Sequence, residues 1–166
     1  VRSLYALMDI LPNSCGIIVA NQGVSCFCAK LLAITYIDVS EECIKALHRL
    51  SSSNPVPVLK GGGLVAVLTY MAFFDTAIQR RAAEAAANMC RGVPADAFQV
   101  VSDGMNNLTG LLLNDDSLVK GGAVLAFLQL SESWYGSEKL LSILNKSGCI
   151  ENLVSIISSY DFEIVN

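Results

Sequence analysis

Charged residues are scarce in this sequence: Asp, Glu, Lys and Arg make up 16% of its 166 residues, against about 25% in an average protein. The 11 Lys and Arg residues are spread thinly along the chain, and the formal net charge is −4. Nucleic-acid-binding proteins usually gather their basic residues on one face. The sequence therefore predicts no nucleic-acid partner.

Histidine is almost absent as well. The single histidine, His48, would have to serve any Ser-His-Asp or Cys-His catalytic arrangement. Its neighbours along a helix include Lys45 and Arg49, a solvated environment that instead predicts an exposed surface or groove position. We therefore expect no catalytic residues in this segment.

No metal or disulfide pattern is recognisable among the cysteines. Their spacing fits neither a zinc ligand set nor a small disulfide framework. We expect reduced, mostly buried thiols, as in cytoplasmic or nuclear proteins, and no metal, cofactor or small-molecule ligand. The six cysteines are Cys15, Cys26, Cys28, Cys43, Cys90 and Cys149.

Long uninterrupted apolar runs are missing, although mean hydropathy is high at +0.51. The longest stretch without charge, Ile10–Ala29, is broken by polar residues and by Pro12. The next one, Gly61–Phe74, is shorter than the ~20 residues that span a bilayer. No targeting signal is visible at Val1. We expect no membrane partner, a location in the cytoplasm, the nucleus or both, and a segment of a longer protein, because the first residue is not methionine.

A helical pattern recurs along the chain with steps of 40, 41 and 45 residues, beginning at Gly23, Gly63, Gly104 and Cys149. After each start, apolar residues follow at i, i+3 and i+7, which is one face of a helix. The same face therefore occurs four times. Its members are Val24, Phe27 and Leu31; Leu64, Val67 and Met71; Met105, Leu108 and Leu112; and Ile150, Leu153 and Ile157.

A second helical pattern follows each of the first three and predicts helices over Val39–Leu50, Ile78–Met89 and Val119–Leu130. Four residues before each end stands an alanine, a side chain small enough for close helix packing. The same register places Ala6 in a helix over Val1–Leu11. We expect the four alanines to be buried; they are Ala6, Ala46, Ala85 and Ala126.

A period of about 40–47 residues with helical units is typical of armadillo and HEAT arrays. Three helices per unit and the glycine turns favour armadillo. The predicted fold is an all-α, right-handed α-solenoid of about four armadillo repeats, the first and last incomplete. The predicted divisions are 1–12 (last helix of a truncated repeat), 13–54, 55–94, 95–136 and 137–166 (partial repeat). Short first helices are expected at Cys15–Asn21, Pro57–Lys60, Ala97–Ser102 and Glu138–Lys146.

Two further features of the predicted third helices have structural consequences. Asp38, Asp75 and Asp116 precede these helices, where a carboxylate can cap exposed amides. Gly121 and Gly122 fall inside the last of them, and because glycine costs about 0.5–1 kcal/mol in mid-helix, we expect that unit to be the loosest.

Equivalent positions on the third helices form two ladders, which suit an extended peptide or a folded partner lying across a concave solenoid face. Asn88 is the strongest candidate, because its amide both donates and accepts hydrogen bonds. Tyr5, Asp9 and Leu125 occupy the same positions on other helices. The predicted binding residues are Lys45, Arg49, Glu84, Asn88 and Gln129.

The residues of these repeats resemble the armadillo consensus. Gly148–Ile157 is similar to the consensus second helix, and Ile78–Cys90 is similar to the consensus third helix. More specifically, Leu4–Cys90 resembles the armadillo domain of HECT-type E3 ubiquitin-protein ligases of the ubiquitin-fusion-degradation branch, which includes the plant trichome-branching ligase and the animal thyroid-receptor interactor. The residues that carry this resemblance include Asp9–Pro12, Gln22–Val24, Asp38–Leu47, Phe73–Phe74 and Ala86–Cys90.

The resemblance implies a protein-binding scaffold that recognises a substrate degron or ubiquitin, in a ligase whose catalytic domain lies outside this chain. Alternatively, the chain is an armadillo adaptor for signalling or transport without ligase activity. Nuclear-import adaptors are expected to repeat a Trp–Asn pair along the groove. The single tryptophan here, Trp134, lies outside the predicted third helices, which disfavours import cargo as the ligand.

Overall fold

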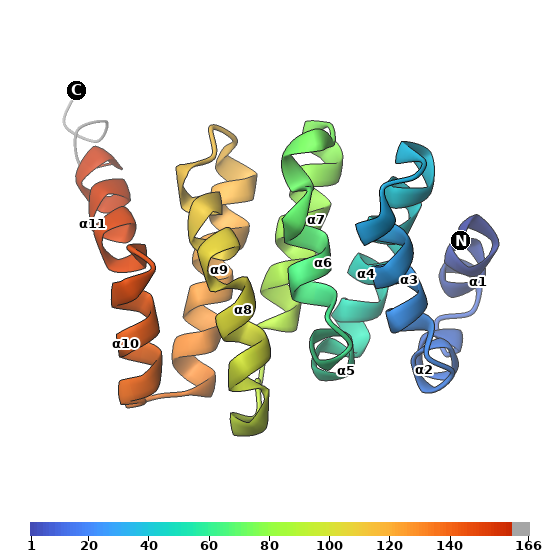
Figure 1. The fold of residues 1–166 in the computed structure, drawn as a ribbon, viewed down its shortest axis with the longest axis horizontal. Helices are drawn as coiled ribbons and strands as arrows, with labels where there is room; N and C mark the ends of the chain where they lie inside the picture. Colours follow the sequence, from blue (N-terminus) through green and yellow to red (C-terminus); the bar gives the residue numbers. More distant parts are fainter. Residues whose placement is uncertain (161–166) are drawn as a thin grey trace.

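The computed structural model describes residues 1–160, and every regular element within them is a helix. The helices stand side by side along the long axis of the molecule, from α1 at one end to α11 at the other (Figure 1). The α-helices are α1 (Arg2–Ile10), α2 (Ser14–Ala20), α3 (Gly23–Ala33), α4 (Ile37–Ser53), α5 (Pro55–Lys60), α6 (Gly63–Thr69), α7 (Thr76–Met89), α8 (Phe98–Gly110), α9 (Ser117–Ser133), α10 (Glu138–Lys146) and α11 (Cys149–Tyr160). Three 3₁₀-helices join them: η1 (Met71–Phe73), η2 (Ala95–Ala97) and η3 (Leu111–Leu113).

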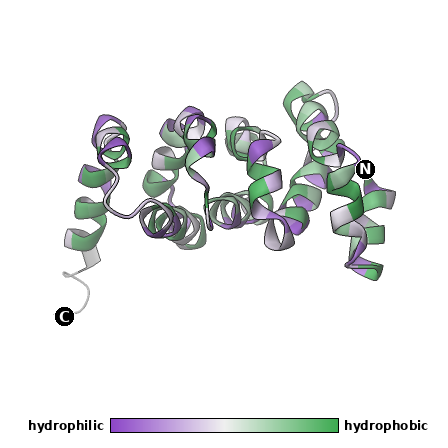
Figure 2. Ribbon diagram, turned by 90° about the horizontal axis from the view of Figure 1, so that it is seen from below, coloured by the Kyte–Doolittle hydropathy of each residue, from purple (hydrophilic) through white to green (hydrophobic). Residues whose placement is uncertain are grey.

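The third helices α4, α7 and α9 form a layer of their own. Helix α7 packs against both α4 and α9, and α1 packs against α4. The second helices form the other layer, in which α6 packs against both α3 and α8. In the middle of Figure 2 the third helices lie below the second helices. The prediction of an all-α solenoid of armadillo type is confirmed.

The apolar faces that defined the repeat form the core between the two layers. In α3, α6 and α8 with their adjoining 3₁₀-helices, all nine residues of the predicted pattern are buried. In α11 the corresponding face is open: Ile150 and Ile157 are exposed, and no third helix covers them within the described residues. The core is therefore continuous across the first three patterns and incomplete at the fourth.

Three of the four predicted alanines mark the contact positions of the third helices. Ala46, Ala85 and Ala126 are fully buried, as predicted. Ala6 is exposed, so the prediction for α1 is wrong. Helix α1 packs mainly against α4 and α2, and it buries Met8 there.

The third unit departs from the prediction of separate first and second helices. Each other second helix follows a residue with left-handed backbone, namely Gln22, Gly62 or Gly148. The equivalent residue here is Asp103, which stays helical, so α8 runs unbroken through Gly104. The expected separate helix Ala97–Ser102 is therefore wrong. The other first helices begin and end within two residues of their predicted bounds.

The expectation that the glycine pair loosens the third unit stays a prediction, but Gly122 also has a packing role. A Cβ atom added there would lie 2.9 Å from the Cβ of Ala83 and 3.1 Å from its carbonyl carbon. Gly122 thus permits the close approach of α9 to α7. Around Gly121, by contrast, nothing lies within 4 Å of an added Cβ.

Two of the three predicted helix caps are present. Asp75 accepts a hydrogen bond from the amide of Ile78 at 2.9 Å, at the start of α7. Asp116 caps α9 by accepting bonds from the amides of Leu118 and Val119. Asp38 lies inside the first turn of α4, so its predicted role as a cap is wrong.

Two remaining expectations concern the chain as a whole. Within residues 1–160 no single helix is long and apolar enough to cross a membrane, although the bent pairs α2–α3 and α10–α11 reach that length and composition when joined. The predicted repeat boundaries stay a prediction, and the last predicted repeat, 137–166, extends beyond the described residues.

Candidate partner-binding face

The five residues predicted to bind a partner lie on the third helices, and we call their surface the third-helix face. Lys45 and Arg49 are on α4, Glu84 and Asn88 on α7, and Gln129 on α9. Glu84 is exposed and the other four are half-buried. Because α4, α7 and α9 pack in sequence, these positions follow one another from helix to helix. Their role in binding stays a prediction.

Side chains on α4 and α7 bond to one another across this face. His48 Nε2 lies 3.0 Å from Glu84 Oε2, and the amide nitrogen of Asn88 donates to the hydroxyl of Ser51 at 3.3 Å. Sequence reasoning missed His48 and Ser51 as partners. The equivalent residues of the next unit, Ala87 on α7 and Cys90 directly after α7, are small and buried, which marks these positions as ones of close helix contact.

Further contacts tie Arg49 and Lys45 to acidic neighbours. Arg49 Nε lies 3.6 Å from Asp9 Oδ1 on α1, which is an ion pair too long to be a hydrogen bond. Lys45 Nζ lies 2.9 Å from Glu42 Oε1 on the same helix. Both cations of the third-helix face are thus already paired with carboxylates.

The His48–Glu84 pair leaves a net negative charge at its centre. Burial lowers the pKa of His48 below its ordinary 6.5, and Arg81 and Arg49 act in the same direction, while Glu84 opposes them. At pH 7 His48 is therefore mostly neutral and donates its Nε2 proton to the carboxylate. The side chain of Glu84 is 59% exposed.

On α9 the third-helix face becomes apolar. Leu125 occupies the position of Lys45 and Glu84, and Leu128 that of His48; both are exposed. The predicted binding residue on α9, Gln129, is polar and half-buried. The face therefore changes from charged on α4 and α7 to mainly apolar on α9.

The cysteines have the properties of buried thiols. Burial raises the pKa of Cys28 and Cys90 to about 12 and that of Cys43 and Cys149 to about 11. Thiolate is the nucleophilic form of cysteine, so these four are unreactive at neutral pH. Cys26 is exposed. Within residues 1–160 no group of His, Cys, Asp and Glu is arranged to hold a metal ion.

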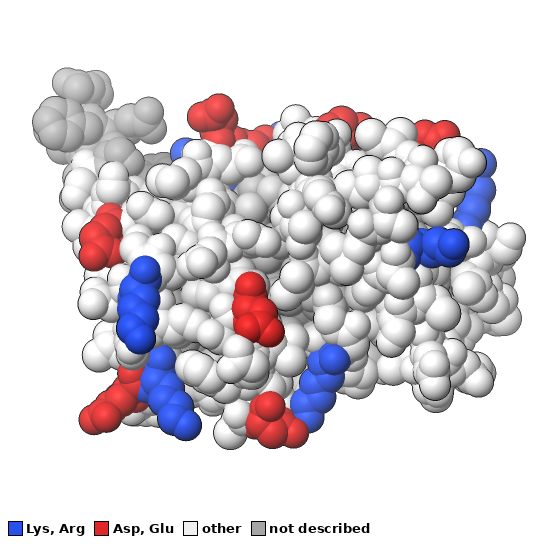
Figure 3. Space-filling model, viewed as in Figure 1, with Lys and Arg blue, Asp and Glu red and all other residues white. Residues whose placement is uncertain are grey.

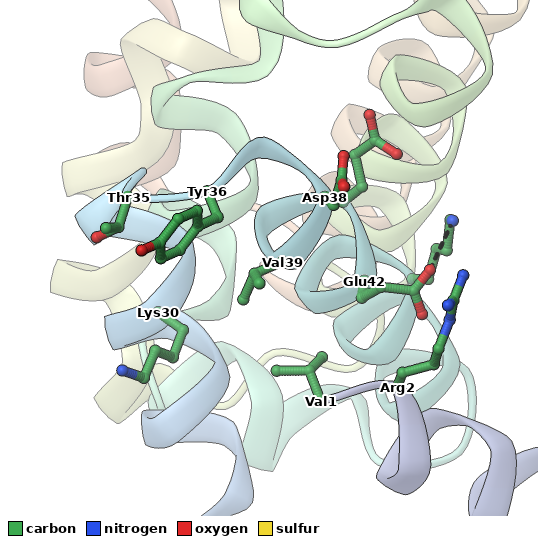
Figure 4. A pocket seen from close by; sticks show the side chains of 10 residues that line it. Val1, Arg2, Lys30, Thr35, Tyr36, Asp38, Val39 and Glu42 are labelled. Atoms are coloured by element: carbon green, nitrogen blue, oxygen red, sulfur yellow. Dashed lines mark hydrogen bonds and ion pairs between the residues drawn. The ribbon is translucent and has the colours of Figure 1, made fainter.

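A cavity of about 710 Å³ lies between the first residues of α1, the end of α3 and the start of α4. Figure 4 shows Lys30 and Tyr36 on one wall and Arg2 with Glu42 on the other. Charges of both signs line this open cavity, so it favours neither an anionic nor a cationic small molecule.

Comparison with known proteins gives a consistent set of relatives. The family described as E3 ubiquitin-protein ligase TRIP12-like, TPR repeats, matches residues 1–60. E3 ubiquitin-protein ligase UPL3 of Arabidopsis thaliana is 38% identical over 158 residues, or 95% of this chain. E3 ubiquitin-protein ligase TRIP12 of Danio rerio is 31% identical over 94% of this chain. The chain spans only 8% of the length of each of these ligases.

Two other matches bear on the fold. Importin subunit alpha-8 of Arabidopsis thaliana is 30% identical over 92% of this chain and 34% of its own length. A designed armadillo repeat protein in complex with the peptide (KR)4 superposes with a TM-score of 0.76, covering 95% of this chain and 66% of the designed one at 17% identity. That structural match supports the armadillo architecture. The units here, of about 40 residues, also exceed the 34-residue TPR repeat.

The predicted resemblance is therefore confirmed: this chain is an armadillo-type repeat segment similar to the repeat regions of HECT-type E3 ubiquitin ligases.

Proposed function

We propose that this chain is a non-catalytic recognition arm of an E3 ubiquitin ligase and holds a protein substrate or ubiquitin on its third-helix face. The observation that carries the proposal is the row formed by Arg49, Asn88 and Gln129, which are hydrogen-bonding side chains at equivalent positions of α4, α7 and α9. The similarity to UPL3 and TRIP12 over nearly the whole chain supports the link to ubiquitin ligases.

The bonds across the third-helix face hold its side chains in place for a ligand. Asn88 donates one amide hydrogen to the hydroxyl of Ser51. Its side-chain amide can still donate a second hydrogen and accept a hydrogen bond through its oxygen. Glu84 offers a charged acceptor beside it, and Gln129 a further amide on α9. Each hydrogen bond contributes a modest ~0.5–1.5 kcal/mol to binding, so the affinity comes from several of these side chains together.

The change to leucine on α9 indicates how a partner is oriented. A segment lying across the face would place polar groups against Glu84 and Asn88 and an apolar side chain against Leu125. The mixed character of the face disfavours a purely basic or purely acidic ligand. We propose a protein segment that has both polar and apolar side chains, bound in the cytoplasm or nucleus.

We propose that ubiquitin transfer itself takes place in a part of the ligase outside this chain. Transfer by this class of ligase requires a reactive cysteine, and four of the cysteines here have pKa values of about 11 to 12. His48, the one histidine, is occupied by Glu84. The role proposed for this segment is therefore binding.

The second candidate is a transport adaptor, which the similarity to importin subunit alpha-8 supports. Against it stands the absence of tryptophan from the ladder positions, which carry Lys45, Glu84 and Leu125. Trp134 lies beyond the end of α9 and packs on Phe98. A lysine-rich nuclear-localisation peptide is the probe that separates the two candidates.

The test is a binding titration of this chain with ubiquitin chains, with peptides from ligase substrates and with the nuclear-localisation peptide. Asn88→Ala and Arg49→Ala are compared with the wild type. The matched control is Asn106→Ala, because Asn106 is exposed on α8, away from the third-helix face. We expect the two third-helix variants to weaken binding of ubiquitin or substrate peptide without abolishing it, and the control to bind normally. Unchanged binding by both folded variants would contradict the proposed site. Binding of the localisation peptide alone, weakened by Asn88→Ala, would favour the adaptor.

A further inference from the structure

Three loops that join a second helix to a third lie along one edge of the stack, and each exposes one bulky apolar side chain. These side chains are Tyr36 between α3 and α4, Phe73 between α6 and α7, and Leu113 between α8 and α9, and they are 70%, 72% and 69% exposed. Scattered exposed apolar residues are normal on protein surfaces. Three of equal exposure in the same loop of three successive units form a regular row.

An exposed aspartate stands two residues after each of these side chains. The aspartates are Asp38, Asp75 and Asp115. Within the described residues none of the three is in an ion pair, whereas the neighbouring Asp116 is neutralised by Arg80 at 2.7 Å. Figure 3 shows acidic side chains at three places along the upper edge, over the loops that Figure 1 places there. We call these six residues the loop edge.

Basic residues near the loop edge do not cancel its charge. Lys30, Arg2 and Lys45 line the same cavity as Asp38. Lys45 is paired with Glu42, and Figure 4 shows Arg2 on the side of Glu42 and the amino group of Lys30 directed away from Asp38. Lys120 lies one turn into α9 and is half-buried. The loop edge is therefore acidic and apolar in alternation, which is complementary to a segment that alternates basic and apolar side chains.

The spacing of the helices limits the length of such a segment. Packed helices lie about 8–10 Å apart, so three successive loops extend over roughly 20 Å. An extended chain advances about 3.3 Å per residue, so about six residues reach across all three loops. The match requires only a short segment, and it does not involve the third-helix face.

We infer that the loop edge binds a short lysine- or arginine-rich segment of a partner protein that carries apolar side chains between its basic residues. The apolar side chains pack on Tyr36, Phe73 and Leu113, and the basic ones pair with the adjacent aspartates. This inference does not rest on the function proposed for the third-helix face, because it uses a separate set of residues.

The test measures fluorescence anisotropy of a labelled peptide of about 12 residues in which lysine alternates with leucine, twice the length that the three loops require. One comparison peptide has glutamate for lysine, and another has serine for leucine. The edge variants are Phe73→Ser and the triple variant Asp38→Asn, Asp75→Asn, Asp115→Asn. Asparagine keeps the capping oxygen at the start of α7, so the triple variant removes charge without removing the cap.

We expect the lysine–leucine peptide to bind the wild type about tenfold more tightly than either comparison peptide, and less tightly as salt is raised. The triple variant should lose about tenfold in affinity and Phe73→Ser about fivefold. The matched controls Ile17→Ser and Asp103→Asn, which are exposed elsewhere, should bind as the wild type does. Equal binding by edge variants and wild type, equal loss in the controls, or loss in Asn88→Ala alone would overturn the inference.

Discussion

Replacing Gly122 with alanine should destabilise the protein, although alanine is the better helix former. Glycine in a helix interior costs about 0.8–1 kcal/mol relative to alanine, so propensity alone predicts a gain. The added methyl group would lie 2.9 Å from Ala83 Cβ and 3.1 Å from the Ala83 carbonyl carbon. Neither atom is the end of a flexible side chain, so α9 and α7 must move apart.

The net effect follows from comparing these two terms. Overpacking of a well-packed contact costs about 1–3 kcal/mol, and after the propensity gain the expected loss is up to about 2 kcal/mol. The effect should be concentrated at the α7–α9 contact, because stability in a repeat array is a sum of unit and nearest-neighbour terms.

Gly121→Ala is the matched control, one residue away on the same helix. Nothing lies within 4 Å of a Cβ atom there, and Gly121 is exposed, so the propensity gain of about 0.5–1 kcal/mol should appear undiminished. Urea unfolding followed by circular dichroism measures both variants. If Gly122→Ala raises the unfolding midpoint as Gly121→Ala does, the inferred close approach of α7 and α9 is wrong.

Three further predictions address backbone strain and charge. Gln22→Gly should stabilise the chain by about 0.5–1 kcal/mol, because Gln22 has left-handed backbone with φ of 62°; a lower melting temperature would contradict this. Arg80 lowers the pKa of Asp116 from 3.8 to about 2, so the stability from this pair is present above about pH 4 and is lost as pH falls towards 2. Acid unfolding of Arg80→Gln should lack that part of the pH dependence, and an unchanged curve would show that the pair is not formed. The NMR titration of His48 should have a midpoint below 6.5, and Glu84→Gln should lower it further because Glu84 raises this pKa; an upward shift would refute the contact between them.

Much of the stack follows from local patterns in the sequence. The alanines at Ala46, Ala85 and Ala126 identify the third helices, because close packing needs a small side chain at the same place in every unit. The apolar positions at i, i+3 and i+7 identify the second helices, because the same face of the helix is buried in each of the first three units. The spacing of apolar residues indicates which side of a helix is buried. Because the same spacing recurs in each unit, it can be recognised without any knowledge of distant contacts.

Other features depend on contacts that a local pattern does not contain. Ala6 has the same register as Ala46 but is exposed, because burial requires a neighbour and not only a position. Helix α8 continues through the expected break because Asp103 stays helical where Gly62 turns. The predicted binding residues lie on neighbouring helices as expected, but the bonds from Asn88 to Ser51 and from His48 to Glu84 depend on how far α7 sits from α4.

The most direct test of the third-helix face as a binding site is an NMR titration of the chain with ubiquitin and with a substrate peptide, following side-chain amide signals. Asn88 and Gln129 report on the third-helix face, and Asn106 and Gln99, exposed on α8, report on the other layer. We expect the signals of Asn88 and Gln129 to shift on binding while those of Asn106 and Gln99 stay in place. Binding that shifts only the α8 signals would contradict it.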